Sequence, residues 1–264
     1  MNHVRIENIQ IAYDDAGSGP TLLLVHGYPF NRSLWNEQGA ALSNTHRVIT
    51  VDLRGFGDSE SSEGPSTMNQ MARDLASLMD ALNITTAIIG GLSMGGYVVL
   101  AFYKHFADRV RALVLADTRA QADTEEGRQT RLKQVEHIRQ EGMAGIADAM
   151  LPKLLTPETV SKRPEVVRRI RDMMIRTKPE GAAGALLGMA SREDQTSLLA
   201  QINVPTLILV GREDPITPVE DSETMHSRIQ DSRLVVIENA AHVSNIEQAD
   251  VFNQELKAFL ENID

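Results

Sequence analysis

One serine in this sequence stands where a reactive hydroxyl would be expected. Ser93 lies between Gly91 and Gly95, after an apolar run over 86–89 and before a helix-like run over 98–106. This spacing is typical of a nucleophile elbow, a sharp strand-to-helix turn that holds the serine hydroxyl clear of the backbone. The two glycines are needed because strand and helix come too close there for a Cβ atom. Chance supplies the pattern in roughly one chain of this length in ten, so the remaining catalytic parts must be sought elsewhere.

The first of these parts is a base, because a serine hydroxyl is a poor nucleophile until its proton is removed. Of the seven histidines, His242 lies in a loop just past the end of the predicted parallel strand 234–237, and His26, which also follows a predicted strand, is assigned a structural role below. Open α/β sheets place their sites at that edge. We therefore predict His242 as the base. The other histidines lie before the elbow, far along the helix that follows it, or in later helical stretches: His3, His26, His46, His105, His137 and His226.

The base needs a carboxylate to fix its tautomer and to stabilise its protonated form. Asp214 follows the predicted strand 206–210 at the same sheet edge. Asp117 is a competitor because it follows the predicted strand 111–116, although it could instead cap the next helix. Glu213 is a lesser rival. We favour Asp214, which gives the chain order serine, acid, histidine.

The tetrahedral oxyanion of an acyl transfer needs two N–H donors, each typically worth about 2.7–4 kcal/mol of barrier. The residue after the nucleophile supplies one donor, here the backbone N–H of Met94. The loop after an earlier strand supplies the other, and His26-Gly27-Tyr28-Pro29 follows the predicted strand 21–25. We therefore predict the backbone N–H of Tyr28 as the second donor. His26 is expected to hold this loop by hydrogen bonds.

Short apolar strands alternating with amphipathic helices must position these residues. This rhythm predicts an α/β fold with a mostly parallel, doubly wound sheet. A hairpin is expected over 3–14, a helix that begins after Ser66 or Thr67, and a last helix that contains 251–260. The predicted buried strands are 21–25, 47–51, 86–89, 111–116, 206–210 and 234–237.

The rhythm stops between residues 118 and 198, where helical patterns are interrupted by prolines and are rich in methionine. We predict a helical cap here, inserted between late strands of an α/β core formed by 1–117 and 199–264. Flexible methionine side chains would suit a lid over an apolar pocket.

The composition limits the kinds of molecule that the protein is expected to bind. With 26 Lys and Arg against 36 Asp and Glu, the net charge is −10, which disfavours nucleic acid and anionic membranes. The chain has no cysteine and no phosphate-binding glycine loop or zinc motif, so we expect no cofactor and no metal. The first residues lack the apolar h-region of a signal peptide, and no 18-residue apolar run appears, so we expect a cytoplasmic protein. The sequence leaves a homo-oligomer open.

Five short motifs, in order along nearly the whole chain, resemble those of the α/β-hydrolase superfamily. They are His26-Gly27-Tyr28-Pro29, Asp52-Leu53-Arg54-Gly55-Phe56-Gly57-Asp58-Ser59, Gly91-Leu92-Ser93-Met94-Gly95-Gly96, Gly211-Arg212-Glu213-Asp214 and Ala241-His242. Within the superfamily the chain looks most like small bacterial carboxylesterases grouped with aryl esterases, cofactor-free perhydrolases and 3-oxoadipate enol-lactonases. The resemblance implies a helical cap with the acyl pocket between cap and sheet, and it carries over Tyr28 and Met94 as oxyanion donors.

Departures from related families narrow the activity. Ser93 stands where epoxide hydrolases and haloalkane dehalogenases have aspartate. Enol-lactonases usually show Asn-Ser in place of His26-Gly27, whereas Pro29 is shared with perhydrolase-type relatives. We therefore expect a serine carboxylesterase acting on a small-molecule ester or lactone with small to medium acyl groups. The alternatives are a perhydrolase or haloperoxidase with the same triad, an enol-lactonase, and a non-catalytic ligand-binding protein.

Overall fold

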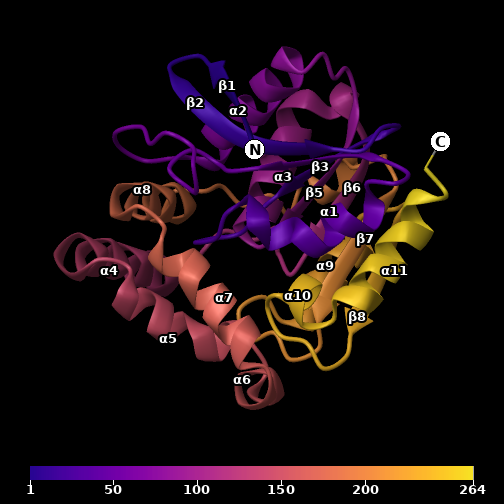
Figure 1. Ribbon diagram of the computed structural model, residues 1–264. Helices are drawn as coiled ribbons and strands as arrows, with labels where there is room; N and C mark the ends of the chain where they lie inside the picture. Colours follow the sequence, from indigo (N-terminus) through magenta and orange to yellow (C-terminus); the bar gives the residue numbers. More distant parts are fainter. Residues whose placement is uncertain (264) are drawn as a thin grey trace.

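The computed structural model describes residues 1–263 and contains one eight-stranded sheet (Figure 1). The spatial order is β1-β2-β4-β3-β5-β6-β7-β8. The first two strands form a hairpin that pairs antiparallel to β4, and all later neighbours are parallel. The α/β fold predicted from the sequence is thus confirmed. The strands are β1 (Asn2–Ile6), β2 (Ile9–Ala16), β3 (Thr21–Val25), β4 (Arg47–Val51), β5 (Ala87–Leu92), β6 (Val110–Ala116), β7 (Thr206–Gly211) and β8 (Ser232–Ile237).

Helices lie on both faces of the sheet because its central strands are apolar on both sides. In β3, for example, Leu23 and Val25 belong to one hydrophobic cluster and Leu22 and Leu24 to the other. The first cluster contains side chains of α2, α3 and α9, and the second contains side chains of α1 and α11. These helices are α1 (Asn36–Leu42), α2 (Met68–Ala81), α3 (Met94–Phe106), α9 (Val219–Arg228) and α11 (Ala249–Leu260), with the short α10 (Ser244–Glu247) preceding α11.

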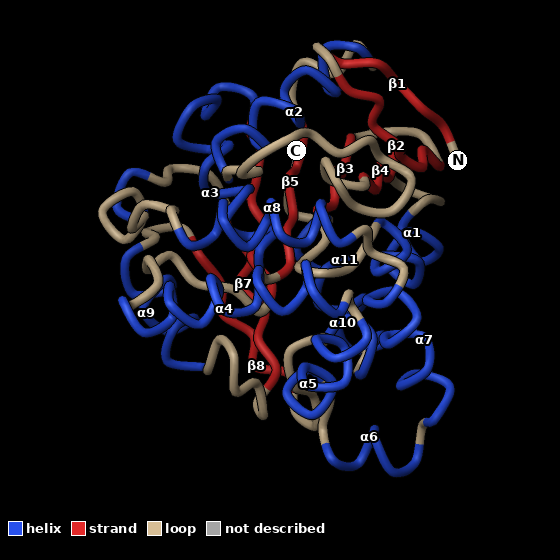
Figure 2. Tube along the Cα trace, turned by 90° about the vertical axis from the view of Figure 1, so that its left-hand side faces the viewer, coloured by secondary structure: helices blue, strands red, loops and turns tan. Residues whose placement is uncertain are grey.

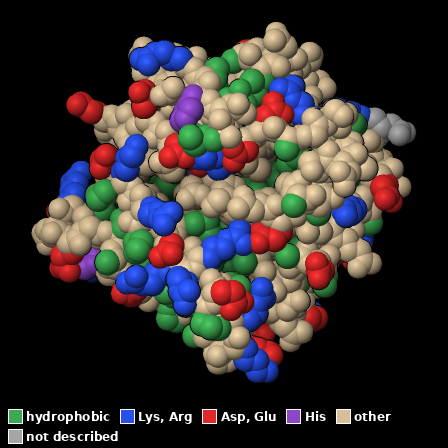
Figure 3. All heavy atoms as spheres, viewed as in Figure 1, with side chains coloured by type: hydrophobic (Ala, Val, Ile, Leu, Met, Phe, Trp, Pro, Cys, Tyr) green, Lys and Arg blue, Asp and Glu red, His purple; other side chains and the backbone are tan. Residues whose placement is uncertain are grey.

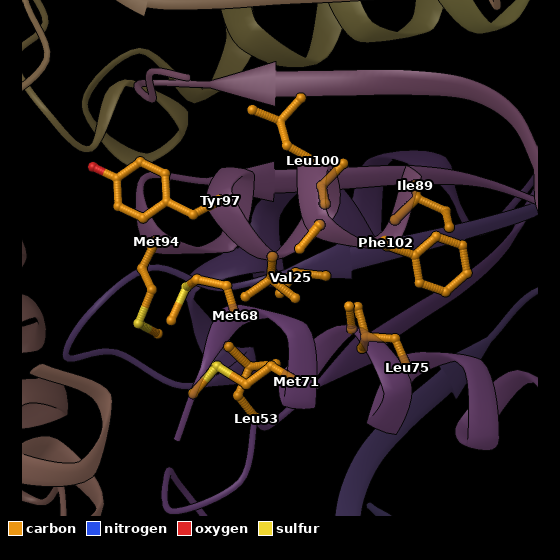
Figure 4. Close-up of a cluster of buried hydrophobic side chains, with 14 of the residues drawn as sticks. Val25, Leu53, Met68, Met71, Leu75, Ile89, Met94, Tyr97, Leu100 and Phe102 are labelled. Atoms are coloured by element: carbon orange, nitrogen blue, oxygen red, sulfur yellow. The ribbon is translucent and has the colours of Figure 1, made fainter. Parts of the chain in front are cut away.

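Two helix boundaries refine the sequence prediction. Thr67, one of the two expected caps, begins α2, since its Oγ1 accepts a hydrogen bond of 3.1 Å from the N–H of Gln70. The helix after the elbow begins at Met94, directly after the serine, rather than at 98. Its inner face packs on α2 around Val25, with the hydroxyl of Tyr97 pointing away from the cluster (Figure 4).

Five helices connect β6 to β7, and they are gathered on one side of the molecule (Figures 1 and 2). They are α4 (Glu125–Glu141), α5 (Ala144–Leu154), α6 (Pro157–Lys162), α7 (Pro164–Ile175) and α8 (Pro179–Ala190). The insertion predicted at 118–198 is therefore helical. No helix within residues 1–263 is long and apolar enough to cross a membrane. The face seen in Figure 3 carries interspersed acidic and basic side chains.

Glycines fix α8 directly against the loop that precedes α2. A Cβ atom on Gly188 would lie 1.9 Å from the carbonyl oxygen of Ser66, and one on Gly181 would lie 1.9 Å from that of Gly55. Backbone therefore packs on backbone at both ends of the helix, which leaves this part of the insertion no room to accept a side chain.

We expect Gly188→Ala to lower the free energy of unfolding by about 1–3 kcal/mol, because the added methyl group forces two backbones apart. The matched control is Gly39→Ala in α1, where a Cβ atom meets nothing within 4 Å. That change should stabilise the protein by about 0.4–1 kcal/mol through the lower entropy of the unfolded chain. Urea unfolding of both variants checks the pair, and equal effects would contradict the close packing of α8.

Candidate active site

The chain turns sharply between β5 and α3, and Ser93 is the residue at the turn. Its φ of 55° and ψ of −116° are strained for a residue with a side chain. A Cβ atom on Gly91 would lie 2.3 Å from the carbonyl carbon of Gly95, and one on Gly95 would lie 2.3 Å from the carbonyl oxygen of Val25. The glycine spacing is therefore a steric requirement of this turn, as the sequence predicted.

His242 joins the serine to an acid. Its Nε2 lies 2.8 Å from the Oγ of Ser93, and its Nδ1 lies 2.7 Å from an Oδ2 of Asp214. All three side chains are buried. Because Asp214 can only accept at Nδ1 when ionised, the Nδ1 of the ring carries a proton and Nε2 is free to accept the proton of the serine hydroxyl.

Asp214 is held as a carboxylate by donors on its own loop. The backbone N–H groups of Ile216 and Thr217 donate to Oδ1 at 2.8 and 3.1 Å, and the Thr217 hydroxyl donates to Oδ2 at 2.7 Å. Burial alone would raise the pKa of Asp214, but the facing His242 and these hydrogen bonds hold it below its ordinary value. Thr217 is a part of the site that sequence reasoning missed, since a threonine three residues after the acid carries no distinctive signal.

The same carboxylate shifts the histidine in the opposite direction. Burial would lower the pKa of His242, but the charge of Asp214 and the hydrogen bond to it raise the pKa above its ordinary value of 6.5. Arg119, on the loop after β6, opposes this shift with its positive charge. The imidazole is thus a stronger base than a free histidine.

Asp117, the rival acid in the sequence, forms no hydrogen bond with the histidine ring in the structure. Its Oδ1 accepts the N–H of Gly211 at 2.8 Å, and its Oδ2 lies 2.6 Å from the hydroxyl of Ser244. It does not cap the first helix of the insertion either, because Thr124 is the cap of α4. Burial first, and then the charge of Asp214, raise the pKa of Asp117 to about 8, so this side chain is largely protonated at neutral pH.

The histidine loop is also fixed from its other side. Glu247, buried in α10, accepts the N–H of Ala241 at 2.6 Å and the N–H and hydroxyl of Thr156 at 2.8 and 2.9 Å. One carboxylate therefore ties the loop that carries His242 to the start of α6. Sequence reasoning missed Glu247 and Ser244 because neither belongs to a recognisable motif.

The loop after β3 lies beside the elbow, where a second oxyanion donor was predicted. A Cβ atom on Gly27 would lie 3.2 Å from that of Ser93. Buried His26 holds the loop, since its Nε2 accepts the N–H of Leu53 at 3.1 Å and its Nδ1 lies 2.8 Å from the carbonyl of Gly27. This agrees with the structural role expected for that histidine, and burial lowers its pKa.

Neither predicted oxyanion donor has a hydrogen-bond acceptor within residues 1–263. Met94 is the first residue of α3, so its N–H has no partner within the helix. Within residues 1–263 the N–H of Tyr28 donates to no protein acceptor. The helix N-terminus at Met94 adds a positive potential at the same place.

A hollow of about 490 Å³ opens next to this loop and the acid loop. Tyr28 and Ile216 line it from the sheet side, and α4 and α5 line it from the insertion. Its apolar contribution comes from Ile146, Ala149, Met150 and Ile216. Space for a small ligand thus exists between the helical insertion and the sheet. No group of three or more acidic or histidine side chains in the described part of the chain could hold a metal ion.

Comparison with known proteins agrees with the α/β fold. A family model described as alpha/beta hydrolase fold matches residues 20–249. The chain is 31% identical over 241 residues to a 3-oxoadipate enol-lactonase of Acinetobacter baylyi, a match that covers 91% of this chain and 88% of the relative. It is 32% identical over 247 residues to a pimeloyl-[acyl-carrier protein] methyl ester esterase of Neisseria meningitidis, covering 91% of this chain and 76% of the relative.

Solved structures give the same picture. A thermophilic esterase from Thermogutta terrifontis, determined with malate bound, superposes with a TM-score of 0.95 at 43% identity and covers 97% of this chain and 94% of its own. An enol-lactonase from Burkholderia xenovorans superposes with a TM-score of 0.93 at 32% identity, covering 99% and 100%. The similarity extends over the whole chain, the helical insertion included.

The buried proton on Asp117 predicts a pH dependence of stability. The unfolded chain loses this proton near the ordinary pKa of 3.8, whereas the folded protein keeps it to about pH 8. The folded state therefore binds more protons between these values, and the free energy of unfolding falls as pH rises through this window. Asp117→Asn retains an acceptor for Gly211 and a donor for Ser244 but cannot ionise. Between pH 5 and 8.5, wild type should lose ~2 kcal/mol or more relative to the variant in urea unfolding. Parallel curves for the two proteins would contradict a protonated Asp117.

Proposed function

Because the chain belongs to the α/β-hydrolase fold family and is a hydrolase, we propose that it is a serine carboxylesterase with an acyl-enzyme intermediate. The observation that carries this proposal is the continuous chain from the Oγ of Ser93 through His242 to Asp214, with contacts of 2.8 and 2.7 Å. Nucleophile, base and orienting acid thus stand in hydrogen-bond reach of one another, which is the geometric requirement for activating a serine.

The proposed reaction has two halves. In the first, Ser93 attacks the ester carbonyl while His242 takes its proton, and the backbone N–H groups of Tyr28 and Met94 hold the oxyanion. The C–O bond to the alcohol then breaks, and the alcohol leaves with the proton from His242. In the second, His242 deprotonates water, which attacks the acyl-enzyme and releases the acid and free Ser93.

The relatives support esters and lactones as the substrate class, since they are named as esterases and enol-lactonases. We propose small to medium acyl groups, for which the hollow between the insertion and the sheet offers space. A lactone is opened by the same steps, with the alcohol remaining attached to the acid product. An assay panel should therefore contain p-nitrophenyl esters from acetate to decanoate, several lactones and, for the perhydrolase alternative, acetate with hydrogen peroxide. Rapid peracid formation without ester turnover would replace the esterase proposal.

We expect Ser93→Ala and His242→Ala to lower kcat for p-nitrophenyl acetate by about 10⁴–10⁶-fold, because nucleophile and base act as one unit. Asp214→Asn should cost about 10⁴-fold, since the amide favours the wrong histidine tautomer. Asp117→Asn should lower kcat far less, because that side chain forms no hydrogen bond with the histidine ring. A fluorophosphonate probe should label wild type and not the Ser93→Ala variant. Absence of labelling in the wild type would favour a non-catalytic binding protein.

The raised pKa of His242 sets the expected pH profile. Turnover needs the neutral imidazole, so kcat/KM for a neutral ester should fall as pH is lowered through the pKa of His242. Because Asp214 raises this pKa above 6.5, the midpoint of the acid limb should lie above pH 6.5. Initial rates between pH 5 and 9 on an uncharged ester measure it. A midpoint well below 6.5 would show that the base lacks the predicted support from its carboxylate.

A further inference from the structure

Arg119 lies close to the nucleophile without taking part in the triad. It follows Thr118, whose hydroxyl donates a 2.7 Å hydrogen bond to the carbonyl oxygen of Ser93. Its charge lowers the pKa of His242, and its side chain is 27% exposed. A cation in this position is neither a surface group nor an element of the reaction described above.

The neighbours of Arg119 use only part of the hydrogen-bonding capacity of its guanidinium group. Its Nη atoms form long ion pairs with Asp123 at 3.5 Å and Asp221 at 3.8 Å, and the hydroxyl of Tyr97 is a further partner, but its buried Nε has none. Asp123 is instead satisfied by Arg131 and by Arg192, the latter at 2.7 Å. The five N–H groups of a half-buried guanidinium normally donate to acceptors, so Arg119 has N–H groups left that can donate to a ligand.

The hollow beside the acid loop collects further donors. Arg119, Arg131 and Lys153 line it, against the carboxylates of Asp123 and Glu126. Asp123 contacts Arg131 and Arg192, Asp221 lies 3.8 Å from Arg119, and Glu126 and Lys153 are both exposed, so four basic groups stand against three acidic ones. The local balance is thus positive in a chain whose net charge is −10.

The hydroxyl of Tyr28 provides a second, independent indication. The side chain is 6% exposed, it lines the same hollow, and its oxygen has no hydrogen-bond partner. Burial raises the pKa of this hydroxyl, so it stays neutral and can donate. An unsatisfied buried hydroxyl is costly unless something binds to it.

We propose that this hollow binds a carboxylate on the substrate, held by Arg119 together with the hydroxyl of Tyr28. The proposal rests on the proposed esterase function and specifies its substrate class: half-esters of dicarboxylic acids, or lactones and acyl esters that carry a carboxylate. The planar guanidinium matches a carboxylate with two parallel N–H groups. Partial burial makes the pair stronger than an exposed ion pair. Apolar Ile146 and Met150 would contact the methylene groups between the carboxylate and the scissile carbonyl.

The test compares charged and neutral substrates of equal chain length. Monomethyl glutarate against methyl pentanoate places the carboxylate on the acyl side, and 4-acetoxybutanoate against butyl acetate places it on the alcohol side. In a pH-stat at pH 7.5, wild type should prefer the charged member of at least one pair by tenfold or more in kcat/KM. Arg119→Gln should reduce that preference by about 10–100-fold, and Arg119→Lys should restore part of it because the charge returns without the fork.

Matched variants separate the local effect from a general one. Arg128→Gln also removes one positive charge, but from α4. Arg128 pairs with Glu125 and does not line the hollow, so the preference for the charged substrate should remain. Tyr28→Phe removes the hydroxyl but retains the backbone N–H, and it should also weaken the preference. Inhibition of methyl pentanoate hydrolysis by glutarate provides a measurement in wild type that requires no variant.

Three outcomes are decisive. A wild type that hydrolyses both members of each pair equally, with no inhibition by glutarate, overturns the carboxylate proposal while leaving the esterase intact. A preference that persists in Arg119→Gln overturns the role of Arg119. If no ester is hydrolysed at all, the proposed function itself fails.

Discussion

The turn at Ser93 is the constraint on which the other parts of the site depend. The strained φ of the serine is tolerated only where β5, α3 and the loop after β3 approach without side chains between them. The end of β6 completes the support. Ala116 accepts the N–H of Ser93 at 2.9 Å, and Thr118 donates to its carbonyl. The nucleophile is thus held by its neighbours in the sheet, and its position is set before any substrate arrives.

Asp117, which lies between Ala116 and Thr118, connects the nucleophile elbow to the loops that carry the acid and the base. Its carboxyl group contacts Gly211, three residues before Asp214, and Ser244, two residues after His242. Two carboxyl groups in one buried site cannot both ionise cheaply. The ionised one is Asp214, which has a histidine and three donors, and the protonated one is Asp117. This division gives the imidazole one anionic partner and keeps the second acid as a neutral bridge.

Much of this arrangement could be predicted because the glycines, the serine and the histidine have positions that few other roles require. The apolar strands predicted the sheet, and the residues that follow them predicted the edge of the sheet at which the site lies. The sequence favoured Asp214 over Asp117, but the strand ends alone do not separate them, because both follow parallel strands at that edge. Only the spatial order, with β7 next to β8, brings Asp214 to the ring. Thr217, Ser244 and Glu247 were missed because hydrogen bonds between loops leave no periodic trace in a sequence.

The cap was predicted to begin at residue 118, but in the structure its first helix begins at Glu125, and the residues before it lie next to the sheet. Thr118 and Arg119 lie just after the end of β6. Thr118 supports the nucleophile, and its neighbour Arg119 lines the hollow. Arg119 is bonded directly to Thr118, whose hydroxyl contacts Ser93, whereas groups on α4 and α5 reach the site through the packing of the insertion. Selectivity for a charged substrate would therefore be set by the rigid part of the site, and the helices would supply mainly shape and apolar contact.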